Sequence, residues 1–378
     1  MPDFDLVTLA ATLPWLTVWF AFSLAVVAVW FLNPVARRAG WVDRPNARKI
    51  HEGEVPLVGG FAMLFALITV QFTTHAEHRA PMGYWIGALL LFLVAVSDDR
   101  SPIRARYRFT VQLAAALAGV SLGGHVLPNL GDLFGTGLLT NVWLMMLVSI
   151  LGTVAVINAV NFTDGADGLC GGLGLIGLWW FLIALAIADG ASDASGQDVA
   201  TYGASLIPLA AATMGALAGF LLFNMRAPWR KKAAIFMGDS GSTLIGFTLA
   251  WLAIHVTSAN GSASISPVTC LWILAVPLAD SASCIVRRIL SGVTPMTADL
   301  KHLHHLVYRS GLTVGQSVLA IQAGAFLCGM IGVAGWWAGI ADYWMFGAFV
   351  ATLSAFVGVT NLMWRRIDGV RTIIGVRA

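Results

Sequence analysis

The chain has 378 residues, of which 58% are hydrophobic and only 11% are charged, and its formal net charge at pH 7 is +3. Soluble domains carry about 25% charged residues, so this composition excludes the two or three soluble domains that the length alone would permit. The four cysteines form no CxxC pair and have no zinc-type spacing, so the sequence predicts neither a disulfide framework nor a cysteine metal site.

Apolar runs of nearly bilayer-spanning length repeat along the whole chain. Because backbone polar groups must be hydrogen-bonded within lipid, each run is expected to be a helix. The first run follows Asp3 and Asp5 rather than the basic residues of a signal peptide, so we interpret it as a retained helix. The sequence therefore predicts one all-α integral membrane domain, residues 1–378, with about 11 (10–11) transmembrane helices. The predicted spans are 13–32, 56–74, 83–97, 109–126, 138–157, 169–188, 203–223, 241–257, 267–285, 318–337 and 344–363.

Basic residues are distributed very unevenly over the loops between these spans. If the loops are counted alternately, one set carries 21 of the 22 Lys and Arg residues, and the other set carries only Arg79. Lys and Arg gather in cytoplasmic loops, so we expect a periplasmic N-terminus and a cytoplasmic C-terminus. The loops expected to carry the catalytic residues on the cytoplasmic side are 33–55, 98–108, 158–168, 224–243 and 286–317.

Two adjacent carboxylates, Asp98 and Asp99, close the third predicted span, and an arginine-rich stretch from Arg104 to Arg108 follows them. Neighbouring carboxylates repel each other, and a divalent cation or an arginine would relieve the repulsion and could leave one carboxylate as a base. Guanidinium groups suit phosphate oxygens. An acidic pair is equally typical of an ordinary helix boundary, so this motif alone does not separate the two interpretations.

The segment 158–169 carries the most specific signal, because amide or carboxylate side chains recur at every third position. In a regular helix, steps of three residues would turn this row away from one face, and two glycines make a continuous helix less favourable. A broken helix end can instead direct these oxygens toward Mg²⁺ shared with substrate phosphates. A polar, Asn-capped turn is the structural alternative. The four residues are Asn158, Asn161, Asp164 and Asp167.

A glycine-rich segment, Phe236 to Thr243, follows a basic loop and begins the eighth predicted span. Its glycines permit close approach of the backbone, the next helix N-terminus offers N–H donors to an anion, and Asp239 could hold a metal beside it. The lysine of a P-loop is absent from this segment. A helix start with Asp239 as its N-cap is the structural alternative.

Two further cytoplasmic loops carry histidines and cations. Three histidines in loop 286–317 have no thiolate beside them and make a poor structural zinc site, whereas imidazoles there can donate to phosphate or sugar oxygens. Loop 33–55 combines cations with a rigid, glycine-ended turn and could form one wall of an anion pocket. The three histidines are His302, His304 and His305.

Taken together, the motifs resemble those of the polyprenyl-phosphate N-acetylhexosamine-1-phosphate transferase superfamily. They are most similar to the bacterial undecaprenyl-phosphate GlcNAc-1-phosphate transferases of the WecA type, over most of the chain from loop 33–60 to about Leu312. The MraY branch, which uses UDP-MurNAc-pentapeptide, typically has three consecutive histidines, and Leu303 interrupts that run here. The motifs that carry the resemblance are Asp43-Arg-Pro-Asn with Pro56-Leu-Val-Gly-Gly, Asp98-Asp-Arg, Asn158 to Leu169, Phe236-Met-Gly-Asp with Gly241-Ser-Thr, and His302-Leu-His-His.

The resemblance implies a phosphotransferase that moves GlcNAc-1-phosphate from UDP-GlcNAc to undecaprenyl phosphate, releases UMP and initiates lipid-linked glycan synthesis of the O-antigen or common-antigen type. It implies a cytoplasmic active site in a bacterial inner membrane and Mg²⁺ as cofactor, with Mn²⁺ as a substitute. Asp98, Asp99 and Asp164 are the expected catalytic residues, with Asp98 as the base that deprotonates the lipid phosphate. Asp239 and Asn161 are the expected metal ligands.

The remaining expected site residues bind substrate. By the resemblance, Asp167 contacts uracil, Phe236 stacks on it, and Arg108 contacts the diphosphate. The expected partners are a UDP-N-acetylhexosamine, undecaprenyl phosphate and, as an open question, a second copy in a homodimer; no nucleic acid is expected. The substrate-binding set is Asp167, Phe236, Asn224, Arg108, His302, His304, His305, Lys49 and His51.

Three alternatives stay open. The same chemistry could use another UDP-N-acetyl sugar, such as a 6-deoxy sugar, GalNAc or MurNAc-pentapeptide. The reaction could pass through an aspartyl-phosphate rather than direct attack. A secondary transporter is the remote alternative, because transporters place charges near the bilayer midplane, whereas Asp280 is the main acid within a predicted span here.

Overall fold

The computed structural model describes residues 14–44, 53–74, 79–124, 126–193, 200–257, 265–294 and 301–374. Within these ranges the chain is mostly helical, and the predicted all-α class is confirmed. Lys49 and His51 lie outside the described residues. The elements are α2 (Trp15–Ala39), β1 (Val42–Asp43), β2 (Val55–Pro56), α3 (Gly59–Thr73), α4 (Met82–Arg100), α5 (Ala105–Gly123), α6 (Val142–Phe162), α7 (Leu169–Asp193), α8 (Ala200–Asn224), α9 (Gly238–Val256), α10 (Pro267–Ile273), α11 (Ala275–Leu290), α12 (Leu303–Arg309), α13 (Val314–Trp337) and α14 (Asp342–Ile374).

Each predicted apolar run coincides with a helix or, in one case, with a bent pair of helices. Among the described residues, seven helices are long and apolar enough to cross a membrane, and α10 with α11 makes an eighth if the pair is one span. α3 is apolar but has only 15 residues. The chain is therefore a multi-pass membrane protein, while the count of eleven spans and their orientation stay predictions.

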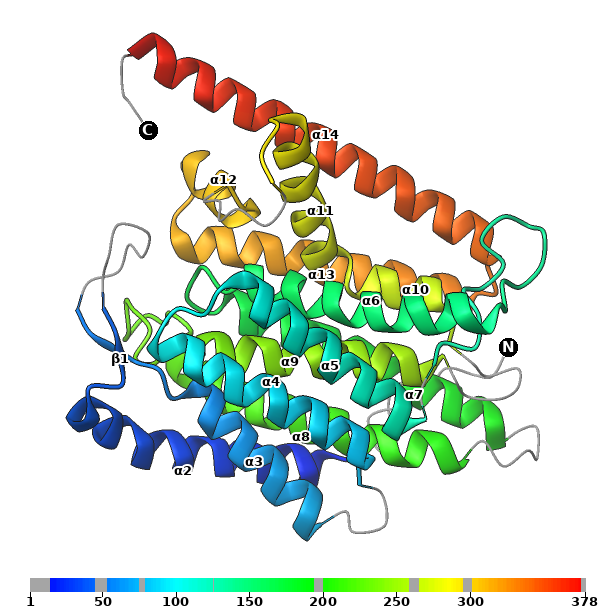
Figure 1. Cartoon of the computed structure of the whole chain (residues 1–378), viewed down its shortest axis with the longest axis horizontal. Helices are drawn as coiled ribbons and strands as arrows, with labels where there is room; N and C mark the ends of the chain where they lie inside the picture. The colour runs from blue at the N-terminus through cyan, green and yellow to red at the C-terminus, as the bar shows by residue number, and fades with distance from the viewer. Residues whose placement is uncertain are drawn as a thin grey trace.

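Most helices lie side by side in one bundle, and successive helices run in opposite directions (Figure 1). The ends that carry the polar motifs consequently meet at one end of the bundle, on the left in Figure 1. There, Phe236 donates its backbone N–H to the Pro56 carbonyl, and Gly59 donates to the Phe236 carbonyl. The predicted motifs before α3 and at the start of α9 are thus joined through their backbones.

Small residues let two helices of the bundle approach closely. Gly215 and Gly219 of α8 face Ala21 and Ala25 of α2, and a Cβ on Gly215 would overlap the backbone carbonyl of Val18. Spacing of small residues by four positions is typical of tightly packed membrane helices, because van der Waals contact takes over where lipid removes the hydrophobic driving force. α2 is thereby fixed against α8.

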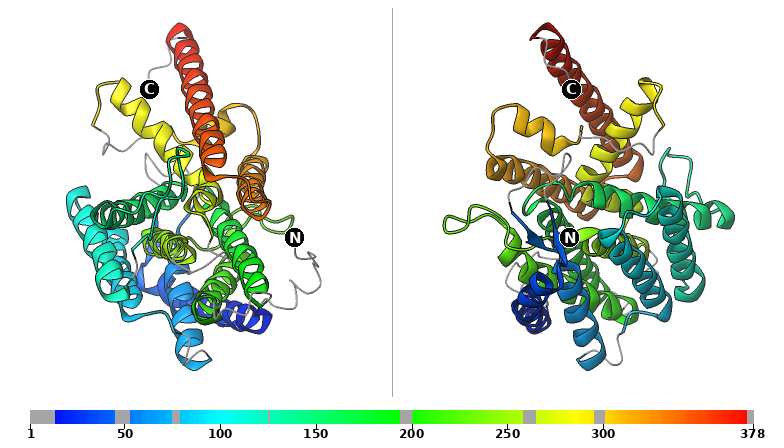
Figure 2. Two further views of the ribbon diagram at one scale, coloured as in Figure 1. Left: turned by 90° about the vertical axis from the view of Figure 1, so that its right-hand side faces the viewer. Right: turned by 60° about the vertical axis from the view of Figure 1, so that its left-hand side comes forward.

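α11 and α14 depart from the direction of the bundle. α11 makes an angle of 78° with α10 and rises from the bundle beside α14, as Figure 2 shows from two sides. At the opposite end of the molecule, Asp342 at the start of α14 accepts hydrogen bonds from the Asp132 backbone N–H (3.2 Å) and the Ser266 hydroxyl (2.6 Å). One carboxylate therefore joins the loop before α6 and the start of α10 to α14.

We expect Gly215→Leu to destabilise the protein, because the added side chain has no room against α2. Overpacking of this kind costs about 1–3 kcal/mol, and the melting temperature in detergent should fall. Gly324→Leu in α13 is the matched control, since a Cβ there meets nothing within 4 Å. Equal melting temperatures for the two variants would contradict the close α2–α8 contact.

Candidate active site

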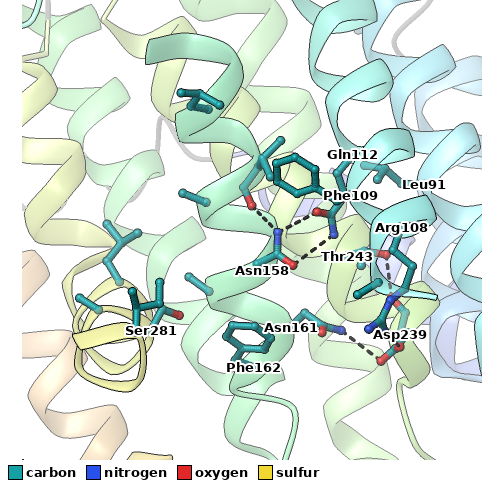
Figure 3. A pocket seen from close by; sticks show the side chains of 18 of the residues that line it. Leu91, Arg108, Phe109, Gln112, Asn158, Asn161, Phe162, Asp239, Thr243 and Ser281 are labelled. Atoms are coloured by element: carbon teal, nitrogen blue, oxygen red, sulfur yellow. Dashed lines mark hydrogen bonds and ion pairs between the residues drawn. The ribbon is translucent and has the colours of Figure 1, made fainter. Parts of the chain in front are cut away.

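The polar motifs meet at the end of a cavity of about 760 Å³ that runs between α4, α5, α6, α11 and α14. Figure 3 shows its polar end, where Arg108, Asn161 and Asp239 converge from three helices. The rest of the wall is mostly apolar. Representative apolar residues are Leu91, Phe109, Leu151, Leu278, Ile285 and Phe349. The arrangement suits an amphiphile whose charged head faces the acids.

Arg108 links two of the expected site carboxylates. Its Nη1 lies 2.7 Å from Asp98 Oδ2 and 3.6 Å from Asp239 Oδ2. The Asp98 side chain is buried, and its other oxygen accepts the Ile103 backbone N–H. Because α4 and α5 are joined by this short turn, the Asp-Asp pair and the arginine-rich stretch fold back onto each other.

Asp99 points to α9 and is not among the residues that line the cavity. Its Oδ1 accepts the Asp239 backbone N–H (2.8 Å), and its Oδ2 accepts that of Ser240 (3.3 Å). A carboxylate at a helix N-terminus satisfies free N–H groups and the helix dipole. Asp99, rather than Asp239, thus occupies the capping place at the start of α9.

Gly238 shows why this junction needs glycine. Its φ is +73°, and a Cβ would lie 2.6 Å from the Asp99 carboxylate. Any other residue would strain the backbone and push Asp99 away from the helix end. The glycine-rich motif therefore serves the contact between α4 and α9.

Asn161 and Asn158 lie at the end of α6, on the cavity wall. Asn161 donates from Nδ2 to Asp239 Oδ1 (3.1 Å) and to the Ser242 hydroxyl (2.8 Å). One turn earlier, Asn158 donates to Gln112 Oε1 (2.7 Å). The segment then turns at residues 163–168, as the broken-helix prediction requires, and Asp164 is exposed on that turn.

The donor set at the polar end fits a divalent cation. Asp98, Asp239 and Asn161 offer oxygen ligands, which Mg²⁺ prefers. Burial and the neighbouring Asp99 raise the pKa of Asp239 to about 6, which indicates carboxylate crowding that a cation would relieve. Asn161 presents its amide nitrogen to Asp239, so ligation would need the opposite amide orientation, with Oδ1 toward the cation.

A second cluster lies around Asp167 and the loop between α8 and α9. Asp167 Oδ2 accepts from Arg226 Nε (2.8 Å) and from the Ala233 backbone N–H (3.2 Å). Asn224 is buried, accepts the Gly168 N–H (2.8 Å) and donates to the Ile235 carbonyl (2.9 Å). Asn224 therefore fixes two backbone segments of the site, while the half-buried Phe236 follows directly after the second.

The three histidines do not share one environment. His302 is buried and lines the cavity, and its Nδ1 donates to Asp280 Oδ2 at 3.0 Å. His304 is buried against Gly165, where a Cβ would lie 2.4 Å from its ring. Burial and the adjacent His305 and His302 lower the pKa of His304 to about 3, so it is neutral at pH 7. His305 is only partly buried beside it.

The loop of the histidines is also held from the C-terminal helix. Trp364 of α14 is buried, and the cationic groups of Arg287, Lys301 and Arg309 lie 4.9–5.8 Å from its ring centre. Cation–π attraction between these three groups and the ring stabilises the contact. The C-terminal helix therefore packs directly against the predicted substrate loop.

Three residues outside the predicted site complete it. Arg226 pairs with Asp167, Gln112 pairs with Asn158, and Asp280 pairs with His302. Of these three residues, only Asp280 stands out in the sequence, because it is an acid within an apolar span, and such an acid is energetically costly unless it is paired. Arg226 and Gln112 contact residues that are far away in the sequence, so no local sequence pattern could predict their contacts.

The amino-acid sequence matches a known protein family and several named proteins. The profile of Glycosyl transferase family 4 matches residues 81–257. A Yersinia pestis protein named undecaprenyl-phosphate alpha-N-acetylglucosaminyl 1-phosphate transferase is 35% identical over 294 residues, which cover 76% of this chain and 75% of that protein. Proteins of the same name from Haemophilus influenzae (33% over 324 residues; 86% and 87% covered) and Escherichia coli K12 (33% over 299 residues; 76% and 74%) are also similar.

We expect Asp99→Ala to destabilise the protein by about 1–2 kcal/mol, the usual cost of losing a helix cap. Asp99→Asn should be less destabilising, because its single amide oxygen can still accept one of the two N–H groups. Melting temperatures in detergent test the order wild type, Asn, Ala. An Asn variant with wild-type stability and no activity would instead assign the Asp99 charge to the chemistry.

Proposed function

This chain belongs to glycosyl transferase family 4, and we propose that it transfers GlcNAc-1-phosphate from UDP-GlcNAc to undecaprenyl phosphate, giving undecaprenyl-diphospho-GlcNAc and UMP. The observation that carries the proposal is the cavity whose apolar length ends at Asp98, Arg108, Asn161 and Asp239. A polyprenyl chain needs the apolar length, and its phosphate needs the charged end. The product would be a substrate for glycosyltransferases that extend a lipid-linked glycan.

The acceptor phosphate is proposed to bind beside Arg108. The Arg108 side chain is about two-fifths exposed, so its guanidinium can turn toward phosphate while remaining near Asp98. Asp98 is the proposed base for a protonated acceptor phosphate, since it lies at the point where the apolar wall ends. The apolar residues of α6 and α11 would hold the first isoprene units against this head.

The UDP-sugar is proposed to bind around Asp167, Phe236 and the histidine loop. This side of the site combines a half-buried aromatic ring, the Asp167–Arg226 ion pair and the partly buried His305. A half-buried ring can stack on uracil, and N–H donors suit the diphosphate and the amino sugar. Asp164, exposed on the turn between the two clusters, would lie between donor and acceptor.

We propose direct in-line transfer at this junction. An acceptor phosphate oxygen forms a bond to the β-phosphorus, the bond from that phosphorus to the bridging oxygen breaks, and UMP leaves with the electron pair. Asp98 would take the proton of a protonated acceptor, and Arg108 would face the developing charge. Mg²⁺, with Mn²⁺ as a substitute, would be held by Asp239 and Asn161 and would supply charge neutralisation on the diphosphate.

We further propose that the protein has eleven spans, with its N-terminus periplasmic and the site facing the cytoplasm of the inner membrane. The basic loops support this orientation, because Arg108 contacts Asp98, Arg226 contacts Asp167, and Arg287 donates to the Lys301 carbonyl beside the histidines. UDP-sugars are made in the cytosol, so this side would reach the donor directly.

The function is tested by incubating the purified protein with undecaprenyl phosphate and radiolabelled UDP-GlcNAc. We expect label to enter extractable lipid and UMP to be released in equal amount. UDP-MurNAc-pentapeptide, offered in parallel, should give far less product, because His304 packs against Gly165 and a sugar bound there would have little room for a lactyl-peptide. Efficient use of the pentapeptide donor would move the protein to the peptidoglycan branch.

Asp239→Asn should abolish transfer while the protein remains folded. A neutral amide holds Mg²⁺ poorly, and removing one group of an electrostatic site lowers turnover by about 100-fold or more. Turnover should be measured over a range of Mg²⁺ concentrations, with Asp132→Asn at the opposite end of the bundle as the control. Wild-type turnover of Asp239→Asn at all Mg²⁺ concentrations would refute the metal assignment.

A further inference from the structure

Asp280 is a buried carboxylate for which the proposed chemistry has no direct use. It lies on α11 and is only 4% exposed. A buried acid is costly unless it is paired, so its surroundings indicate what it does. Both of its oxygens face the histidine loop rather than the cavity acids.

The two oxygens of Asp280 hold two consecutive residues of that loop. Oδ2 lies 3.0 Å from His302 Nδ1, and Oδ1 accepts the Leu303 backbone N–H at 2.8 Å. Leu303 is the first residue of α12, where the His302 side chain provides no cap. A single carboxylate therefore fixes both the His302 ring and the start of the helix that carries His304 and His305.

The geometry points to Asp280 as a positioning residue that holds His302 as a fixed cation on the cavity wall, with Nε2 as the nitrogen that meets a substrate phosphate. This inference rests on the proposed function. Figure 3 shows that α11, through Ser281, forms the side of the cavity that faces Arg108 of α5. Two cations, one from each side, would then flank the same phosphate.

The charge on His302 follows from its neighbours. Burial by itself lowers the pKa of His302, but the hydrogen bonds to Asp280 and Cys284 outweigh burial and raise it to about 10. The charged and titratable groups around His302 are Asp280, Cys284, Arg287 and Arg288 of α11, Lys301 before α12, and His304 on α12, while Phe162 of α6 contributes an uncharged ring. With Nδ1 engaged by the carboxylate, Nε2 is the remaining donor.

A metal ion is the rival explanation for the same residues. Asp280, Cys284 and His302 are all buried, and one ligand atom from each lies within 4.8 Å of the others. However, Arg287 donates to Cys284 Sγ at 3.3 Å, and His302 Nδ1 is at hydrogen-bond distance from the carboxylate. These contacts already satisfy the three groups, so we favour the ion pair and make zinc an outcome of the test.

The test compares Asp280→Asn with the wild type in the lipid-transfer assay from pH 6 to pH 8.5. An Asn side chain can still accept the Leu303 N–H but cannot stabilise an imidazolium. We expect kcat/KM to fall about 10- to 100-fold at pH 8, the scale for losing the partner that orients a histidine. The loss should be smaller at pH 6, where a histidine of ordinary pKa, about 6.5, is protonated by the solution.

Two further variants separate positioning from a structural role. Asp342→Asn is the matched control, because Asp342 also accepts two hydrogen bonds but at the far end of the bundle, and its pH profile should equal that of the wild type. In the His302→Gln background, Asp280→Asn should cause no further loss, since it acts through His302. Additive, pH-independent losses would overturn the proposal, as would wild-type behaviour of Asp280→Asn.

The remaining measurements keep the proposal testable if Asp280→Asn does not fold. In the wild type, a loss of kcat/KM with an apparent pKa near 6.5 that His302→Gln removes would overturn it, because a fixed cation does not titrate there. Stoichiometric zinc that Cys284→Ser removes would also overturn it. A wild-type protein without any lipid-transfer activity would refute the proposed function instead, so the two failures are distinguishable.

Discussion

The contact between the Asp99 carboxylate and the first N–H groups of α9 is the constraint on which the site depends. It joins the end of α4 to the start of α9, and Gly238 leaves the space that it needs. Asp98 directly precedes Asp99 in the chain, and the Asp239 backbone N–H donates to the Asp99 carboxylate. The same contact therefore brings Asp98 and Asp239 within reach of Arg108. The cap formed by the Asp99 carboxylate thus sets the spacing between Asp98 and Asp239.

Every buried acid of the site has a cationic or N–H partner from another segment of the chain. Asp98 meets Arg108, Asp167 meets Arg226, and Asp280 meets His302. Pairing of this kind offsets the cost of burying a carboxylate where lipid and protein lower the local dielectric constant. The pairs also join helix ends from different parts of the chain, so the groups expected to carry the chemistry also help to order the polar end of the bundle.

Much of the fold could be predicted from the sequence, because lipid forces each long apolar run into a helix and the runs are well separated. The bend between α10 and α11 was not predicted, because the run 267–285 is continuous in hydropathy, although Pro277 has no N–H to donate to the Ile273 carbonyl and so favours a break there. At the site, the row from Asn158 to Asp167 predicted a broken helix end, and the turn at 163–168 confirms it. The capping by Asp99 and the Asp280–His302 pair depend on distant partners, which spacing along the chain does not encode.

The position of Arg108 between Asp98 and Asp239 has a consequence for how ligands cooperate. The guanidinium is an internal counter-ion that already offsets part of the negative charge of the two carboxylates. A divalent ion that entered alone would therefore bind with lower affinity than it would to two carboxylates without the arginine. The acceptor phosphate, proposed to bind beside Arg108, would draw the guanidinium toward itself and leave Asp239 to the ion. Acceptor and metal would then bind with positive coupling, and by thermodynamic linkage each would raise the affinity of the other by the same factor.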